Sequence, residues 1–178
     1  PDWAKGKIMY HIFLDRFYRG SKEPLQKMPR RHIHKNWDEP MQIGPDSEGI
    51  WNNDFYGGDL KGIINKLDYI ESLGIDILYL SPIVYSQSNH RYDTANYLHV
   101  DPYVGCEEDL RELCKKAHQK GMKVILDAVF NHTSPKFFAF ADVAEKGRES
   151  KYWDWYYIEG YPLQAEPFTK PNFKTFAY

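Results

Sequence analysis

The sequence predicts an α/β fold built on a parallel sheet, because three apolar runs alternate with two segments of helical periodicity. The runs at 8–13 and 75–80, and the run that begins at Val124, are short and aliphatic, as is typical of strands buried on both faces. The segments at 60–73 and 107–120 precede the second and third runs. This order specifies right-handed crossovers between parallel strands. A doubly wound sheet and part of a (β/α)8 barrel both satisfy it.

The first strand is followed by Asp15 and Arg16, which we interpret as a structural ion pair at the strand end. From 18 to 53 the chain is polar and rich in proline, with no sustained period, which indicates a long loop. This loop contains His32 and His34, whose alternation could bind a metal. Because no further cluster of ligands lies nearby in the sequence, a solvated basic loop is the favoured interpretation.

Both predicted helices carry recognisable signals at their ends. The helix at 60–73 is capped by Asp59 and stops at Gly74, and its apolar residues recur at i, i+3, i+4 and i+7. The helix at 107–120 opens with two glutamates at the positive end of its dipole, and Gly121 ends it. Its inner stripe consists of Leu110, Leu113, Cys114 and Ala117.

No further strand–helix unit follows the third strand in the sequence. Residues 134–178 are aromatic, contain proline and hold a short predicted helix at 137–145. We interpret 134–178 as the beginning of a small domain inserted after the third strand, and 1–133 as the part that carries the sheet. A complete barrel takes about 250 residues, so three strands would supply only its N-terminal part.

Polar residues directly after the third strand form a candidate site. Asp127, Asn131 and His132 follow the apolar run, and in parallel sheets functional groups gather where the strands end at their carboxyl side. The alternative is that Asp127 and Asn131 only cap the following loop. Aromatic residues make up 16% of the chain, which suits either a tyrosine-rich core or a site for flat, hydroxyl-edged ligands such as sugars.

Composition argues against several classes of partner. The 23 basic and 25 acidic residues leave a net charge of -2, so no electrostatic field favours nucleic acid or an anionic membrane. No apolar run approaches the roughly 18 residues needed to span a bilayer. No glycine-rich phosphate loop follows a strand in the sequence, which disfavours nucleotide binding.

The cysteines and the start of the chain bear on its compartment. Cys106 and Cys114 would lie about 12 Å apart on one helix, too far for a disulfide, so we expect two free thiols. The start at Pro1 shows neither an initiator methionine nor a signal-peptide core, and we expect a piece of a longer chain. These features favour the cytoplasm, although secretion stays open.

Three motifs together resemble the α-amylase family of glycoside hydrolases. Residues 127–132, Asp-Ala-Val-Phe-Asn-His, resemble the first conserved motif of that family. Residues 57–60, Gly-Gly-Asp-Leu, and the segment 88–97 are similar to the same family. The tail, at 138–143 and 152–155, resembles the neopullulanase and cyclomaltodextrinase branch. The resemblance covers nearly the whole chain and is weakest in the long loop.

This resemblance implies a (β/α)8 barrel that cleaves α-glucosidic bonds with retention, of which this chain holds the first three βα units. Tyr92 matches the aromatic residue that stacks on the sugar beside the scissile bond. His90 and His132 match the imidazoles that hydrogen-bond the sugar hydroxyls. Asp127 matches the buried acid that helps hold the site together, partly through an arginine on the next strand. Asn131 matches a calcium ligand of many members, although some branches lack this ion and no cofactor is required.

The resemblance also implies that the reacting carboxylates lie outside this chain. Retaining hydrolysis needs a nucleophile and an acid/base about 5–5.5 Å apart, and in this family they come from the fourth and fifth strands, beyond Tyr178. Asp127 has no facing carboxyl group in a matching motif, and Asp93 and Asp101 are better explained as turn residues. We therefore expect 1–178 alone to be inactive, and to self-associate or to pair with the remainder of the barrel.

Three functions stay open at this point. The favoured one is part of a hydrolase acting on α-glucans such as starch, maltodextrin, pullulan or cyclodextrin. The second is a non-catalytic carbohydrate-binding or assembly fragment. The third is an α-glucan transglycosylase, in which a sugar displaces water at the same site.

Overall fold

Three parallel strands form the central sheet of the computed structural model, which describes residues 1–23, 25, 31–47, 49, 51, 53–163 and 173–174. In spatial order the strands are β1 (Met9–Ile12), β4 (Ile77–Leu80) and β7 (Lys123–Leu126). Leu78 of the central strand lies opposite Tyr10 on one side and Val124 on the other. The three predicted strands and their parallel arrangement are confirmed.

The expectation that every strand is buried on both faces is wrong for both edge strands: Met9 and His11 of β1 are exposed, and no residue of β7 is buried. The two end residues of β7 are exposed and its middle two are half-buried, and Leu126 keeps 42% of its surface accessible. Within the described residues β7 pairs with β4 alone, so one of its edges lacks a neighbouring strand. In β4, which lies between two strands, Ile77 and Leu80 are at most 1% exposed. Position in the sheet therefore decides the burial of these apolar runs.

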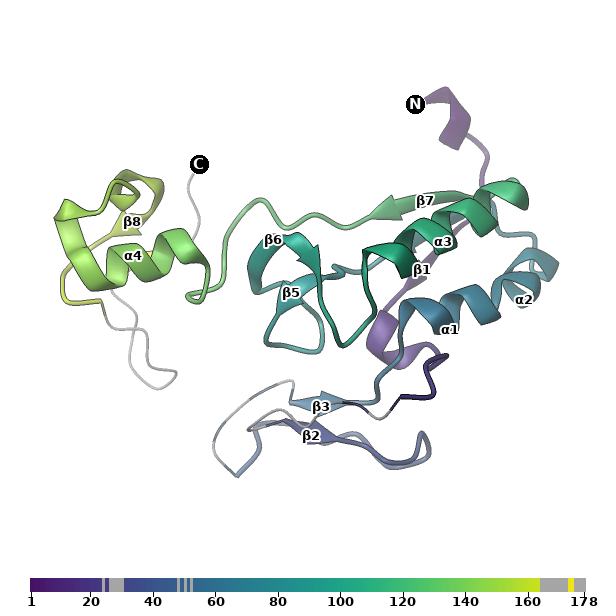
Figure 1. The fold of residues 1–178 in the computed structure, drawn as a ribbon, viewed down its shortest axis with the longest axis horizontal. Helices are drawn as coiled ribbons and strands as arrows, with labels where there is room; N and C mark the ends of the chain where they lie inside the picture. Colours follow the sequence, from purple (N-terminus) through teal and green to yellow (C-terminus); the bar gives the residue numbers. More distant parts are fainter. Residues whose placement is uncertain are drawn as a thin grey trace.

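Three helices pack on one face of this sheet (Figure 1). They are α1 (Leu60–Asn65), α2 (Leu67–Ser72) and α3 (Glu107–Gln119). The first two replace the single helix predicted at 60–73. The chain tightens into a 3-10-like turn at Lys66, because the Lys66 amide hydrogen-bonds to the carbonyl of Ile63, three residues back. The apolar stripe continues across this break into one core with α3 and the strands, which includes Ile12, Leu60, Ile63, Leu67, Ile70, Leu78, Leu80, Leu113 and Ala117.

The short motif before α1 is shaped by close backbone contacts. Gly57 has a φ of +79°, a conformation that favours glycine. A Cβ atom at Gly58 would lie 1.9 Å from the carbonyl oxygen of Leu14, so only glycine fits there. Asp59 caps α1 as predicted, by accepting a hydrogen bond from the amide three residues on. Its carboxylate also accepts two amides of the chain that follows β1, which ties that segment to the helix.

The start of the long loop is joined to its end by Asp15. This residue is 1% exposed and forms an ion pair with Arg16, so the predicted structural ion pair is confirmed. Its carboxylate also accepts the amides of Tyr56 and Gly57, at 3.1 and 3.0 Å. Inside the loop lies β2 (His32–Ile33), which pairs in parallel with β3 (Asp54–Phe55), the segment that directly follows the loop.

A pair of antiparallel strands follows the central strand of the sheet. These are β5 (Val84–Ser86) and β6 (Thr94–Val100). Because β5 begins shortly after β4 ends, the turn between β5 and β6, at 87–93, stands on the carboxyl side of the sheet (Figure 1).

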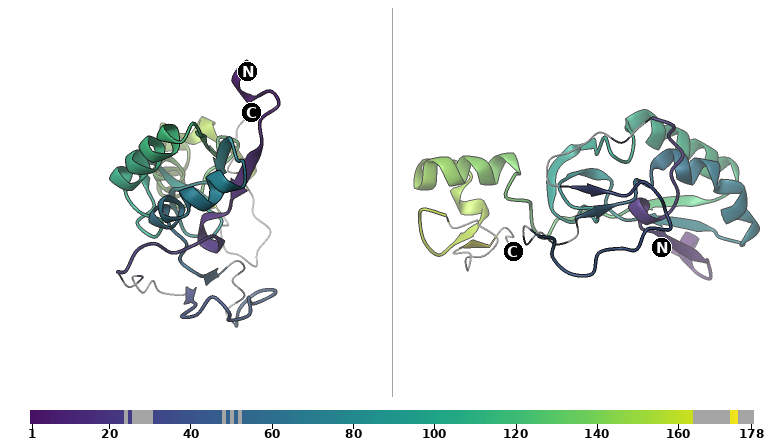
Figure 2. Two further views of the ribbon diagram at one scale, coloured as in Figure 1. Left: turned by 90° about the vertical axis from the view of Figure 1, so that its right-hand side faces the viewer. Right: turned by 90° about the horizontal axis from the view of Figure 1, so that it is seen from below.

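The chain after β7 builds a second, smaller unit, which lies beyond the carboxyl end of that strand, past β5 and β6 (Figures 1 and 2). It contains α4 (Phe138–Lys146) and the antiparallel strands β8 (Tyr157–Ile158) and β9 (Phe173–Lys174). Its own core consists of Ala139, Phe140, Val143 and Tyr156. The short helix predicted at 137–145 is confirmed, and the domain boundary after residue 133 stays a prediction. Short 3-10 turns complete the described elements, at Asp2–Ala4, Leu14–Arg16, Gly147–Glu149 and Trp153–Trp155.

Cys106 and Cys114 are both free thiols, as predicted. Across the part of the chain that the structure describes, no helix combines the length and the apolar character that crossing a bilayer requires.

Candidate functional site

Four predicted site residues, His90, Tyr92, Asp127 and His132, lie together on the carboxyl side of the sheet, and we call them the strand-end cluster. The Tyr92 hydroxyl donates a hydrogen bond to Asp127 Oδ2 at 2.7 Å. His132 Nε2 lies 2.9 Å from the carbonyl oxygen of Tyr92. The ring centroids of His90 and Tyr92 are 5.8 Å apart. The fold thus joins two segments, one after β5 and one after β7, that are far apart in the sequence.

Asp127 controls the ionisation of the tyrosines around it. Its hydrogen bond from Tyr92, together with burial, raises the pKa of that phenol from 10 to about 12. Hydrogen bonding to Asp127 also raises the pKa of Tyr79, on β4. Ionising either phenol would place a second negative charge beside the carboxylate, so both remain protonated donors near neutral pH. Asp127 therefore accepts a hydrogen bond from one phenol and keeps the pKa of a second phenol raised.

His90 presents a neutral imidazole. Burial lowers the pKa of its ring below the ordinary value of 6.5. Its Nδ1 accepts the amide hydrogen of Tyr92 at 3.0 Å and lies 3.1 Å from Ser88 Oγ. In the neutral ring the hydrogen is therefore on Nε2, and a ring in this tautomer can donate to a ligand hydroxyl.

His132 and Asn131 have different surroundings from His90. The Nε2 of His132 donates to the Tyr92 carbonyl, and the side-chain amide of Asn131 lies 3.2 Å from Nδ1 of the same ring. Both ring nitrogens are thus engaged within the protein, and His132 supports the backbone of Tyr92. Asn131 is exposed, and its role as a calcium ligand stays a prediction.

A buried ion pair holds the turn at 87–93 in place. Arg91 and Asp101 are 2% and 0% exposed, and Nε of the guanidinium lies 2.9 Å from Oδ2 of the carboxylate. Arg91 also donates to the carbonyl oxygen of Asn89 at 2.8 Å. The interpretation of Asp101 as a turn residue is incomplete: it accepts the amide of Tyr103, and it also neutralises a buried cation.

A cavity of about 390 Å³ opens beside the strand-end cluster. Its lining includes four apolar side chains and a smaller set of polar groups. Such a mixture suits a ligand that has both C–H faces and hydroxyl edges. The lining residues are Phe13, Arg16, Met41, Gln42, Ile43, Gly44, Trp51, Asp54, Asn89 and His90.

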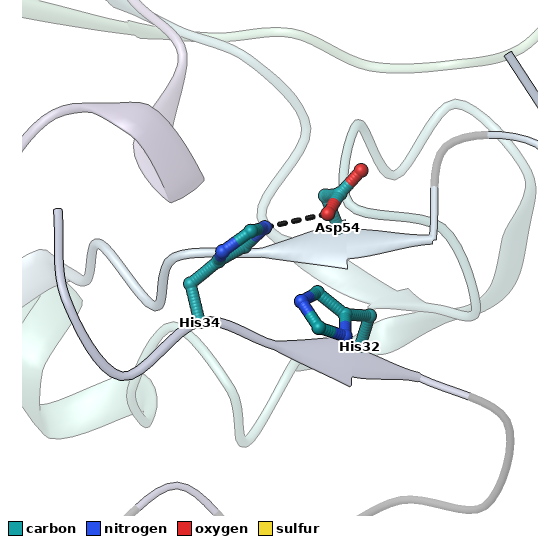
Figure 3. Close-up of side chains that lie close together, drawn as sticks. All are labelled: His32, His34 and Asp54. Atoms are coloured by element: carbon teal, nitrogen blue, oxygen red, sulfur yellow. Dashed lines mark hydrogen bonds and ion pairs between the residues drawn. The ribbon is translucent and has the colours of Figure 1, made fainter. Parts of the chain in front are cut away.

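The interpretation of the segment around His32 and His34 as a solvated basic loop is wrong for His34. Its ring is buried, stacks on Tyr56 with centroids 4.1 Å apart, and lies between the carboxylates of Glu39 and Asp54. One ligand atom from each of His32, His34 and Asp54 lies within 4.8 Å of the others (Figure 3). Asp54 is distant in the sequence, and only the pairing of β2 with β3 brings it to the histidines.

Two further residues of the site were missed by the sequence-based predictions. Tyr79 lies near the end of β4. Its hydroxyl is the polar group of an otherwise apolar strand, and this was a weak signal that it belongs to a site at the carboxyl end of the sheet. Arg91 carried no such signal, because nothing in its neighbourhood in the sequence indicates a buried guanidinium. Its partner Asp101 lies at the far end of β6.

Comparison with known proteins gives a consistent result. The family model for the alpha amylase catalytic domain matches residues 11–177. A cyclomaltodextrinase from Thermoanaerobacter pseudethanolicus is 42% identical over 177 residues, and neopullulanase 2 from Thermoactinomyces vulgaris is 44% identical over 177 residues. Each match covers 99% of this chain and 28% of the relative, so the chain spans little more than a quarter of the length of these curated relatives.

A solved structure gives the same picture. The cyclic alpha-maltosyl-(1→6)-maltose hydrolase from Arthrobacter globiformis, in complex with maltose, superimposes with a TM-score of 0.81 at 34% identity. The match covers 99% of this chain and 39% of that structure.

Proposed function

Because the chain belongs to the alpha-amylase catalytic-domain family, we propose that it is part of an enzyme that hydrolyses α-glucosidic bonds in α-glucans with retention of configuration. The relatives named cyclomaltodextrinase and neopullulanase support this substrate class, as does the neighbour in complex with maltose. In this proposal residues 1–133 supply the first three βα units of a (β/α)8 barrel, and residues 134–178 begin an inserted domain. The observation that carries the proposal is the convergence of the strand-end cluster beside a cavity on the carboxyl side of a parallel sheet.

Each member of the strand-end cluster has a role in this proposal. The ring of Tyr92 stacks on the C–H face of a glucose unit, and its hydroxyl is kept in place by Asp127. His90 donates from Nε2 to a sugar hydroxyl, which its neutral ring permits without adding a charge to the cleft. Without sugar, His132 positions Tyr92 through the hydrogen bond from its Nε2 to the Tyr92 carbonyl oxygen. When sugar binds, Nε2 donates to a sugar hydroxyl instead.

The proposal assigns the reacting carboxylates to other parts of the full-length protein. Retaining hydrolysis uses two carboxyl groups about 5–5.5 Å apart, one as nucleophile and one as acid/base. Asp127 does not take either role, because it already accepts the hydrogen bond of the Tyr92 hydroxyl. Residues 1–178 by themselves are therefore expected to be inactive, and they contribute one wall of the substrate cleft.

The test is the steady-state kinetics of the full-length protein on pullulan and on cyclodextrin. His132→Ala is expected to lower kcat/KM about 10- to 100-fold, because it removes hydrogen bonds that stabilise the transition state. Each tenfold loss corresponds to about 1.4 kcal/mol. Tyr92→Ala is also expected to lower kcat/KM, because it removes the stacking surface. His118→Ala, at an exposed position on α3, is the matched control and should leave the kinetics unchanged. Wild-type turnover in His132→Ala would contradict the assigned role.

The same protein separates the alternative functions. If it converts maltotriose into longer oligosaccharides, with one shorter sugar released from the donor at each transfer, transglycosylation replaces hydrolysis. If it binds maltoheptaose in calorimetry and cleaves none of the α-glucans, a carbohydrate-binding role replaces catalysis.

A further inference from the structure

A second polar cluster, which shares Asp54 with the lining of the cavity beside His90, brings two imidazoles and a carboxylate together between β2 and β3. His32 and Asp54 are directly opposite each other in the register of these strands, and His34 follows β2 by one residue. The ligand atoms of His32, His34 and Asp54 all lie within 4.8 Å of one another (Figure 3). His34 and Asp54 are buried, at 8% and 5% exposure, whereas His32 is exposed.

The position of His34 calls for a cation. Its Nδ1 lies 2.9 Å from Glu39 Oε2, and its Nε2 lies 2.5 Å from Asp54 Oδ1. A neutral imidazole carries one N–H, so it can donate to only one of two flanking carboxylates. The other nitrogen would then point its lone pair at a carboxylate oxygen. Two arrangements remove this repulsion: a second ring proton donated to Asp54, or a metal ion that takes the place of that proton after Nε2 and Oδ1 move apart, while the Nδ1–H bonds Glu39.

We propose that His32, His34 and Asp54 bind a divalent transition metal of the zinc class. Two imidazoles and one carboxylate form a ligand set that zinc uses when three protein groups leave a fourth position open to water. In a tetrahedral site the donor atoms lie about 3.3 Å apart. Nε2 of His34 and Oδ1 of Asp54 lie at a hydrogen-bond distance of 2.5 Å, so metal binding requires these two atoms to move apart and the exposed side chain of His32 to move closer.

The surroundings of this site resemble those that support known metal ligands. The carboxylate of Glu39 at Nδ1 of His34 corresponds to the outer carboxylate that commonly orients a metal-binding imidazole. Stacking on Tyr56 holds the same ring, and the amide of Gln42 donates to Asp54 Oδ2 at 3.1 Å, which orients that carboxylate. We call His32, His34, Glu39 and Asp54 the loop cluster.

The nearby charges also favour a cation. The loop cluster carries two carboxylates, and the guanidinium of Arg16 is engaged with the backbone carbonyl of Asp54 at 3.1 Å and with the ring of Tyr56 at 4.4 Å. Asp54 also lines the cavity beside His90, and Asn89 donates to the Asp54 carbonyl at 2.8 Å. A bound ion would therefore fix the loop that forms one wall of that cavity.

The test uses the full-length protein, freed of metal with a chelator and titrated with Co²⁺ as a spectroscopic probe and with Zn²⁺ by calorimetry. We expect one Co²⁺ per chain at this site, with the visible absorption of a four-coordinate centre, displaced by Zn²⁺. His32→Ala should weaken Zn²⁺ binding at least as strongly as Glu39→Gln, for which a loss of about 10- to 100-fold is expected. His118→Ala removes an exposed imidazole on α3 and should bind Zn²⁺ like the wild type.

Two results would overturn the proposal. One is the absence of a four-coordinate Co²⁺ spectrum in the wild type, and the other is equal Zn²⁺ affinity in His32→Ala and His118→Ala. Because His32 is exposed, its replacement should leave the fold intact, and an unchanged unfolding midpoint of the metal-free variant verifies this. The readouts do not involve glucan hydrolysis, so the outcome is independent of the function proposed above.

Discussion

The strand-end cluster and the loop cluster both combine histidine with carboxylate, but for different ends. In the first, one carboxylate accepts a hydrogen bond from the phenol of Tyr92, and the imidazoles hydrogen-bond neutral groups. In the second, one imidazole lies between two carboxylates. Phenols and neutral imidazoles suit a polyol, whereas paired carboxylates around imidazole suit a cation. The comparison shows that the neighbours of a histidine, more than its presence, decide what it can bind.

The two clusters also differ in what holds them in place. The strand-end cluster rests on the sheet and on the buried ion pair of Arg91 with Asp101. The loop cluster rests on two short strands and on ring stacking against Tyr56. Substitutions that remove one support should therefore affect the two clusters differently.

The largest effect is expected from Arg91→Met. It leaves the carboxylate of Asp101 buried without its partner, at a cost of about 3–5 kcal/mol in the free energy of unfolding, measured by denaturant titration. The control is Lys116→Met, which breaks an exposed ion pair with Glu112 and should cost less than about 1 kcal/mol. The double change Arg91→Met/Asp101→Leu should recover most of the loss, since it removes the stranded charge. Equal losses in Arg91→Met and in the control would show that the pair does not support the turn.

An intermediate effect is expected from Tyr92→Phe. At neutral pH it should cost about 1.5–3 kcal/mol, because it removes a hydrogen bond to the charged Asp127. The folded state raises the pKa of Tyr92 from 10 to about 12, so it binds that proton more tightly than the unfolded state does. The stabilisation is therefore fully present below pH 10 and is lost as the pH rises toward 12.

The measurement is the difference in unfolding free energy between wild type and Tyr92→Phe as a function of pH. This difference should shrink above pH 10. Tyr69→Phe, at a position with 54% exposure, is the control and should show no such trend. A difference that stays constant through the alkaline range would argue against a hydrogen bond between Tyr92 and Asp127.

The smallest effect is expected from Lys120→Ala. Its ammonium group lies 2.6 Å from the carboxylates of both Asp68 and Glu71, which raise its pKa. These partners are 91% and 49% exposed, so water and salt screen the attraction. The destabilisation should be several-fold smaller than that of Arg91→Met, and should vanish at high salt. A loss that persists at high salt would mean that packing of the lysine stem, and not charge, joins α2 to α3.

Much of the fold was predictable because its signals are local. The N-cap at Asp59 and the alternation of strands and helices follow from residue types at fixed spacing. The strand-end cluster was predictable for a related reason. Once a parallel sheet is expected, the residues that follow its strands must meet at the carboxyl side, and Asp127 and His132 directly follow such a strand. Tyr92 and His90 were predicted only from the family resemblance, because they lie in a turn, and hydrophobic periodicity does not predict the position of a turn residue.

Only the tertiary structure decided the burial of His34, the pairing of Arg91 with Asp101, and the exposure of β7. Each depends on which segments meet after the chain has folded back on itself, and such contacts leave no periodic pattern in the sequence. An apolar run, a helix cap and a turn each depend on residues that are neighbours in the sequence. The sequence by itself therefore determined the order of the elements, and the edge of the sheet where a site would lie. The partners of a buried charge are chosen by the path of the chain in space, because a charge removed from water is stabilised by whichever opposite charge or hydrogen-bond donor lies beside it.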